Sequence, residues 1–252
     1  MQKETKLNCG NPKIEHDNII GGANQMIMTQ KEIGNHIRQF ILPAHSSYHV
    51  DKAVLYKRFG DDLYIKGYSF SSGGKIPTAL HVTYFIMPLF LESDTIAYTF
   101  ADELYYAYRE GLFNLKRSKN RVWDVRKASQ DDAFKLINTA MDEQGEPVLA
   151  KFETARDVYD AQKRDMKDNT RVYEACAYST ILFADQGLQD KMLKGLIRET
   201  KNRPAHDYIV LIRERTELLL SKSTREERIG LLKAFANETI SNLKMAQLKP
   251  FT

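Results

Sequence analysis

The chain has 252 residues, of which 42% are hydrophobic and 28% are charged, and its formal net charge is +4. This is the composition of an ordinary folded protein, and it excludes wholesale disorder and a coiled-coil rod. The longest nearly uncharged apolar run, residues 79–91, has 13 residues, whereas a membrane-spanning helix needs about 20. We therefore expect a compact body of one large or two smaller domains without a membrane span.

The first 28 residues show no sustained hydrophobic period and contain Gly21 and Gly22. They lack the apolar stretch of about 7 to 15 residues that a secretory signal requires. We expect residues 1–28 to form an irregular or flexible arm, and the protein to be cytoplasmic. Cys9 and Cys176 lie too far apart in sequence to predict a disulfide framework, and Cys176 is expected to be a small core residue.

A first helix is predicted from Thr29. The spacing of Thr29 and Glu32 is that of a capping box, in which each side chain satisfies an exposed backbone N–H of the other residue. Pro43 prevents the helix from continuing. Apolar residues follow the cap at helical spacing, at Ile33, Ile37, Phe40 and Ile41.

The next segment predicts a small, mostly antiparallel sheet. Residues 53–59 and 63–70 are rich in aromatic and β-favouring side chains and are separated by a short Gly/Asp turn, which indicates a hairpin. Residues 79–87 lack polar alternation, as a central strand buried on both faces does, and Pro88 should end the pairing. We expect a fourth strand at residues 94–100 and a helix beginning at Ala101.

From Asp131 onward the hydrophobic period is helical. The first helix of this half is expected to end at Gly145, and capping boxes at Thr154 and Thr224 should begin two later helices. The fold class predicted is α+β, with an N-terminal helix and small sheet followed by an all-α helical bundle or short solenoid. The expected division is an arm at 1–28, an α+β domain at 29–128 and a helical domain at 129–252.

Several phrases of the chain resemble a group of bacterial proteins without an established activity. They are KRFGDDLYIKGYSF, YFIMPLFLESDTIAYTFADEL, MDEQGEPVLAKFETARDV and EACAYSTILF, together with Trp123. The similarity spans most of residues 30–245 and is most specific at Met87-Pro88-Leu89. Glu92-Ser93 and Asp102-Glu103 depart from the pattern of that group, where Val-Pro and Gly with Arg are usual. The resemblance implies an α+β head with a helical tail, and it implies no reaction.

Two stretches with histidine residues are candidate sites. His45 and His49, near Asp51, have a spacing that suits zinc on a helix, but they follow Pro43 in a serine-rich linker, so solvent-exposed loop histidines are expected. His81 lies in the apolar strand, where a buried neutral imidazole is the main expectation and a catalytic base is the alternative.

Other motifs point away from common enzyme classes. Asp61, Asp62 and Lys66 resemble the acidic and lysine set of a metal nuclease, but the aspartates fall in a turn that favours them for local reasons. The IIGG phrase at 19–22 resembles the start of trypsin-like proteases without their serine motif. The chain contains no P-loop, no dinucleotide fingerprint and no nucleophile elbow. We predict no cofactor and no metal.

Residues 109–127 carry seven basic and two acidic side chains. Basic groups neutralise phosphates, and an aromatic ring such as Trp123 can stack on a base. The plainer interpretation is a solvated surface with Trp123 packed inward. The candidate binding residues, for a protein or a nucleic acid, are Arg109, Lys116, Arg117, Lys119, Arg121, Trp123, Arg126 and Lys127.

Three functions remain open at this point. The first is a non-enzymatic bacterial interaction protein that binds another protein, as an accessory subunit or as an immunity or antiviral-defence binder. The second is nucleic-acid binding through residues 109–127. The third is an enzyme with an unfamiliar site near His81. The first is preferred because no converging catalytic set is visible, and because helical arrays commonly present binding faces.

Overall fold

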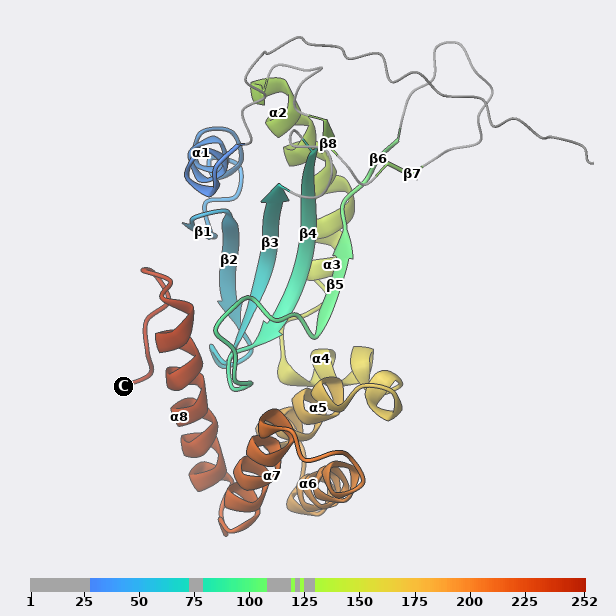
Figure 1. Cartoon of the computed structure of the whole chain (residues 1–252). Coiled ribbons are helices and arrows are strands. Elements are labelled where there is room, and N and C mark those ends of the chain that lie inside the picture. Colours follow the sequence, from blue (N-terminus) through green and yellow to red (C-terminus); the bar gives the residue numbers. More distant parts are fainter. Residues whose placement is uncertain (1–27, 73–78, 108–118, 121–122, 125–129) are drawn as a thin grey trace, which may run out of the picture.

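The computed structural model describes residues 28–72, 79–107, 119–120, 123–124 and 130–252. Within them, an antiparallel sheet in the order β1-β2-β3-β4-β5 is joined at β4 by the short strand β8. Helices α2 and α3 lie on one face of the sheet, and α4 to α8 gather at its lower end (Figure 1). The predicted α+β class with a helical C-terminal region is confirmed.

The first helix begins where the capping box places it. Thr29 accepts a hydrogen bond from the backbone of Glu32 at 3.2 Å, and the Glu32 carboxylate accepts one from the Thr29 backbone at 2.7 Å. Helix α1 spans Gln30–His36 and continues as the wider π turn η1, Ile37–Ile41. Its end two residues before Pro43 agrees with the prediction.

The predicted hairpin is strands β2, Val54–Phe59, and β3, Tyr64–Ser72. Gly60, Asp61 and Asp62 all have positive φ values, of 56°, 54° and 62°. Glycine and aspartate tolerate this left-handed conformation better than most residues. The aspartates therefore have a structural reason to be in the turn, as the sequence indicated.

Strand β4, Ala79–Pro88, is the predicted central strand, and it ends at the proline. The expectations that follow it are wrong. Residues 94–98 form no strand, and β5, Phe100–Glu103, occupies the start of the expected helix. The free edge of β4 accounts for this, because backbone hydrogen bonds from Thr99 to Ile86 and from Leu104 to Val82 pair that edge.

The remaining strands are short. β1, His49–Asp51, pairs with β2, and β6, Tyr106–Ala107, pairs with β7, Lys119–Asn120, while β8 spans Trp123–Asp124. The helices of the second half are α2 (Gln130–Ala140), η2 (Met141–Gly145), α3 (Glu146–Leu149), α4 (Ala155–Gln162), η3 (Asp165–Lys167), α5 (Thr170–Phe183), α6 (Gln186–Lys201), α7 (Asp207–Leu220) and α8 (Arg225–Leu243).

The helix expected to stop at Gly145 continues to Leu149. Pro147 has no N–H to donate and cannot sit in the interior of a regular α-helix. The π turn η2 widens the helix just before it, so Pro147 falls in the first turn of α3, where a missing donor is tolerated. The predicted helix end at Gly145 is wrong, because the π turn, which the sequence pattern does not reveal, lets the helix continue past Pro147.

Buried polar groups join the sheet to α3. The hydroxyls of Tyr48 and Tyr68 both donate to Glu146 Oε1, at 2.7 and 2.9 Å. The Lys66 ammonium donates to the carbonyls of Leu149 and Phe152, at 2.9 and 2.6 Å, and so caps the end of α3. Burial lowers the pKa of Lys66. The polar cluster thus fixes the helices to this face.

Within the described residues, a hydrophobic core runs from the sheet into the helices. Arg225 donates to the carbonyls of Ile181 and Leu182 at the end of α5. Arg228 is buried and donates to Asp190 at 2.7 Å, which ties α8 to α6. Cys176 is buried in the same core, as predicted. The division proposed at residue 128 stays a prediction.

The capping box of α8 supplies a modest stability prediction. Thr224 accepts a hydrogen bond from the Glu227 backbone at 3.2 Å, and Glu227 accepts one from the Thr224 backbone at 3.0 Å. Thr224→Ala should lower the free energy of unfolding by about 1 kcal/mol, because it removes the acceptor for a helix N–H. Urea unfolding measures the change. Thr224→Ser, which keeps the hydroxyl, should lose much less, and equal losses would contradict a capping role.

Candidate functional site

The two faces of the sheet differ in chemistry. On β3 the side chains of Tyr68 and Phe70 are buried against the helices, whereas Ser69 is half-buried and Ser71 is exposed. On β4 the same alternation gives half-buried His81 and Thr83 on the side of the serines. Successive residues of a strand point to opposite faces. At this end of the sheet, one face is therefore polar and partly open to water.

The lower half of that face is covered. Phe85 and Met87 are fully buried there, and the Phe85 ring lies 5.0 Å from the ring of Tyr98 in the loop after β4. Thr239 of α8 donates to the carbonyl of Leu91 at 2.9 Å and holds this loop. The central strand is thus buried on both faces only from Tyr84 onward, whereas the sequence predicts burial on both faces over residues 79–87.

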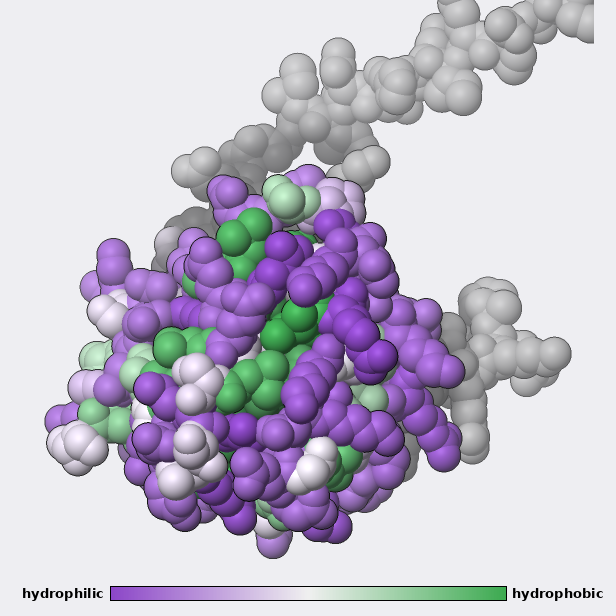
Figure 2. Space-filling model, turned by 90° about the horizontal axis from the view of Figure 1, so that it is seen from below, coloured by the Kyte–Doolittle hydropathy of each residue, from purple (hydrophilic) through white to green (hydrophobic). Residues whose placement is uncertain are grey.

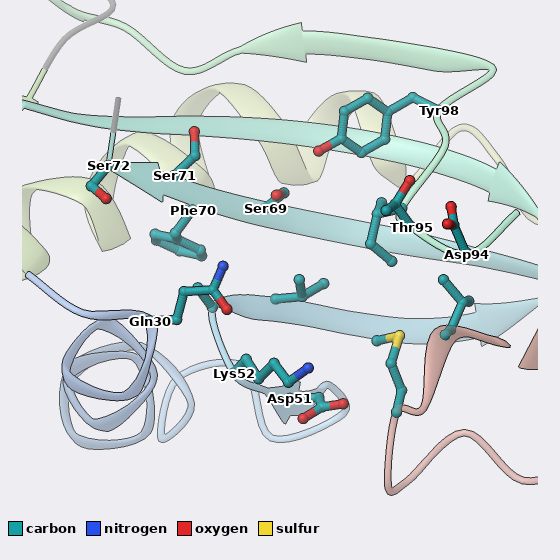
Figure 3. A pocket seen from close by; sticks show the side chains of 15 residues that line it. Gln30, Asp51, Lys52, Ser69, Phe70, Ser71, Ser72, Asp94, Thr95 and Tyr98 are labelled. Atoms are coloured by element: carbon teal, nitrogen blue, oxygen red, sulfur yellow. The ribbon is translucent and has the colours of Figure 1, made fainter. Parts of the chain in front are cut away.

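The open half forms a depression of about 410 Å³, which we call the sheet hollow. In Figure 3, Ser69 and Ser71 lie on its floor, between Gln30 and Lys52 on one side and Tyr98 on the other. Tyr98 is one of the larger exposed apolar side chains of the described residues, at 37%. The remaining lining residues are Asp51, Ala53, Val54, Phe70, Ser72, Asp94, Thr95, Ile96, Leu243 and Met245.

The wall formed by α1 and the β1–β2 turn is closely packed. Lys52 adopts a positive φ of 50° in the turn, and its carbonyl lies against Gly34 of α1, where a Cβ atom would collide with it. Burial raises the pKa of Tyr56 to about 12, and the negative charge of Asp51, beside Lys52, contributes to this rise. Tyr56 therefore stays a neutral phenol at physiological pH.

A second depression of about 690 Å³ lies between α7, the 92–94 loop and the end of α8, and we call it the α7/α8 groove. Asp94 lines both depressions, so both border this loop. Ser93 shapes the loop, since its hydroxyl donates to the Thr95 carbonyl at 2.7 Å and accepts from the Thr95 N–H at 3.3 Å. From below, apolar side chains lie in furrows between hydrophilic ridges of the helical end (Figure 2).

His81 is neither a packed core imidazole nor part of the hollow. Its side chain is 30% exposed, and Nδ1 lies 3.6 Å from Glu103 Oε1 on the neighbouring strand. Ser71 on β3 is its cross-strand partner. The expectation of a buried histidine is wrong, because β4 is open to water at this end. The catalytic alternative stays a prediction.

His45 differs from the expectation of an exposed loop histidine. It is 7% exposed, and its Nε2 lies 3.1 Å from Asn138 Oδ1 and 3.5 Å from Asp142 Oδ1. Helix α2 and the turn η2 pack over the linker and bury it, which the linker sequence alone does not reveal. His49 is exposed, as expected. In the described part of the chain, no three His, Cys, Asp or Glu side chains form a group suited to a metal ion.

The structure places few of the predicted binding residues. Trp123 is 3% exposed and pairs with Leu80 in β8, so its ring is not on the surface where a base could stack. Lys119 pairs with Ala107 through the backbone of β7. The others lie outside the described residues, and their binding role stays a prediction: Arg109, Lys116, Arg117, Arg121, Arg126 and Lys127.

Comparisons with protein families, with curated proteins and with solved structures find no significant match to this chain. The resemblance to the bacterial group therefore stays an expectation. Among the described residues, no helix has the length and apolar character needed to cross a membrane.

The sequence alone predicts neither depression, although one wall of each has a local signal in the sequence. The alternation of aromatic and serine residues at 68–71 marks a strand with one polar face. In α7, five successive apolar residues at 208–212 exceed what one buried face of a helix needs. Neither signal says which other segments form the walls.

Proposed function

We propose that this protein is a non-catalytic accessory subunit of a larger protein assembly, which holds a partner protein on the sheet hollow and the α7/α8 groove. The observation that carries the proposal is the concave surface formed by the two depressions, which share Asp94 as a lining residue. Its walls come from α1, β3, α7, α8 and the 92–98 loop, all parts of the described chain.

The framework around this surface favours recognition without large rearrangement. Helix α8 holds the loop through Thr239, and Asn237 holds the C-terminal tail by hydrogen bonds to Phe251 of 2.7 and 3.1 Å. A binding surface on a rigid scaffold loses less conformational entropy when it docks a partner. The surface is therefore suited to a stable complex.

The lining favours a polypeptide over a small molecule. A small-molecule pocket encloses most of its ligand and presents a few converging polar groups. In the sheet hollow, exposed Ser71 and Ser72 are spread along a strand, and exposed Tyr98 faces them from the loop. Tyrosine with small polar residues is a combination that protein-binding surfaces use, because it offers contact area at low entropic cost.

The test is affinity purification of the tagged full-length protein at native expression, with mass identification of what co-elutes. Ser71→Arg places a bulky charge on the floor of the hollow and should reduce capture of a specific partner at least about tenfold. Ser47→Arg, at an exposed position outside both depressions, is the matched control and should retain the partner. Circular dichroism checks that both variants fold. Equal capture by the two variants, or no enriched protein, would overturn the proposal.

A further inference from the structure

The α7/α8 groove has an excess of negative charge. Among the described residues, its lining includes four carboxylates and no Lys or Arg. None of the four makes an ion pair with a described residue. The chain as a whole carries a formal charge of +4, so the negative charge of the groove is a local feature. The carboxylates are Glu92, Asp94, Asp207 and Glu214.

One of these carboxylates has a structural explanation and the others do not. Asp207 lies in the first turn of α7, where the helix dipole favours an acidic side chain. Glu214 lies two turns further on, where that effect has faded, and Glu92 and Asp94 belong to the loop. The guanidinium of Arg171 lies at the edge of the groove, where it donates to the backbone carbonyl of Glu92 at 2.9 Å and lies over the Tyr208 ring. Exposed carboxylates that are not ion-paired still repel one another at low ionic strength. A cationic occupant would relieve that repulsion.

The wall of the groove is apolar between these charges. Ile209 and Ile212 of α7 face the core and are 8% and 1% exposed. Val210 and Leu211, next to them, are half-buried and line the groove, as does Tyr208. A helix at a protein surface usually has one apolar stripe. The second apolar side of α7 provides a surface on which a partner can bury its own apolar side chains.

We infer that the groove binds a cationic amphipathic segment of a protein partner, with its Lys or Arg side chains on the acidic rim and its apolar side chains on α7. Both parts of the recognition are required. The carboxylates select the charge of the segment, and Val210 and Leu211 supply the apolar contact. The inference rests on the proposed function, because it names the chemistry of the partner that the concave surface would hold.

The test uses a labelled synthetic peptide in which Leu at helical spacing alternates with Lys, and a comparator with Glu in place of Lys. Fluorescence anisotropy with the full-length protein measures binding. The positive net charge of the protein disfavours non-specific attraction of a cationic peptide. Binding of the Lys peptide is therefore expected to come from the groove, to weaken as salt rises, and to exceed binding of the Glu peptide.

Glu214→Lys should weaken binding of the Lys peptide by about tenfold, since it replaces an attraction at the rim by a repulsion. Glu143→Lys is the matched control, because it makes the same charge change at an exposed position outside the groove and should leave affinity unchanged. Absence of binding, equal loss in both variants, or equal affinity for the Glu peptide would overturn the inference.

Two further outcomes separate this inference from the proposed function. A partner captured by the wild type, lost by Ser71→Arg and retained by Glu214→Lys would leave the proposed function standing and overturn the cationic segment. Self-association of the pure protein in sedimentation, abolished by Glu214→Lys and not by Glu143→Lys, would also overturn it, because the occupant would then be a second copy of this chain.

Discussion

Replacing Gly145 with alanine is expected to lower the free energy of unfolding by about 1 to 3 kcal/mol through overpacking. Gly145 has φ of −78° and ψ of −53°, which any residue adopts. Helix propensity alone would make the alanine variant about 1 kcal/mol more stable. A Cβ atom here, however, would lie 2.6 Å from Cε1 and 2.9 Å from Cζ of Tyr68. Tyr68 is fully buried and bonded to Glu146, so its ring has little room to move.

Gly230→Ala is the matched control for this substitution. Gly230 lies in the second turn of α8 and is exposed, and a Cβ atom there would meet no atom of the described residues within 4 Å. It should gain up to about 1 kcal/mol. Urea unfolding of the two variants and of the wild type measures whether the two changes in the free energy of unfolding have opposite signs. A gain at both positions would show that the sheet and the helix are not packed at Gly145 as closely as the structure has them.

The parts of the fold that the sequence predicts well are those set by local chemistry. The capping boxes at Thr29, Thr154 and Thr224 are all formed. The turn at residues 60–62 and the stop at Pro88 also depend on side chains within a few positions. In each case the same few residues satisfy the backbone in isolation and in the folded chain, so no distant partner is needed to decide the structure.

The failure at residues 100–107 has a non-local cause. The spacing of apolar residues from Phe100 onward suits a helix as well as an edge strand. The decision depends on β4, whose outer edge needs hydrogen-bond partners and obtains them from Phe100–Glu103. His45 is a similar case, because its burial depends on α2, which begins 85 residues later at Gln130. The local spacing of apolar residues reveals neither the pairing of Phe100–Glu103 with β4 nor the burial of His45.

The candidate site could be predicted only in part. The polar side of β3 and the long apolar run of α7 are visible in the sequence, but their concavity is not. Both depressions depend on the loop after β4 being held by Thr239 of α8, a contact between residues 148 positions apart. The basic segment, which is the most visible charge feature of the sequence, lies mainly outside the described residues. The strongest sequence signal and the concave surface are thus different parts of the chain.

Glu174→Gln is expected to stabilise the protein at high pH and to leave its stability unchanged at low pH. Glu174 of α5 is 2% exposed, and burial raises its pKa to about 7, against the lowering effects of the Tyr208 hydroxyl and of Arg171 and Arg215. Tyr208 donates to Glu174 Oε2 at 2.8 Å. The glutamine of the variant keeps an oxygen acceptor for that hydroxyl and carries no charge.

The direction follows from the protons bound in each state. The unfolded carboxyl titrates near pH 4.5 and the folded one near pH 7, so between these values the folded protein holds a proton that the unfolded chain has released. The contribution of Glu174 to the free energy of unfolding therefore falls as pH rises through this window, by about 3 kcal/mol in total. Glu174→Gln removes that loss, whereas other titrating groups act equally in both proteins.

Urea unfolding of the wild type and of Glu174→Gln at about pH 4.5 and about pH 8 measures the effect. The variant should match the wild type at the lower pH and exceed it by up to about 3 kcal/mol at the higher pH. Because Tyr208 also lines the α7/α8 groove, a pH-independent loss in the variant would show instead that the Glu174 carboxyl does not change its charge between these pH values and is needed to hold this tyrosine. A gain at the higher pH alone would show that the buried, charged form of Glu174 lowers the free energy of unfolding of the wild type.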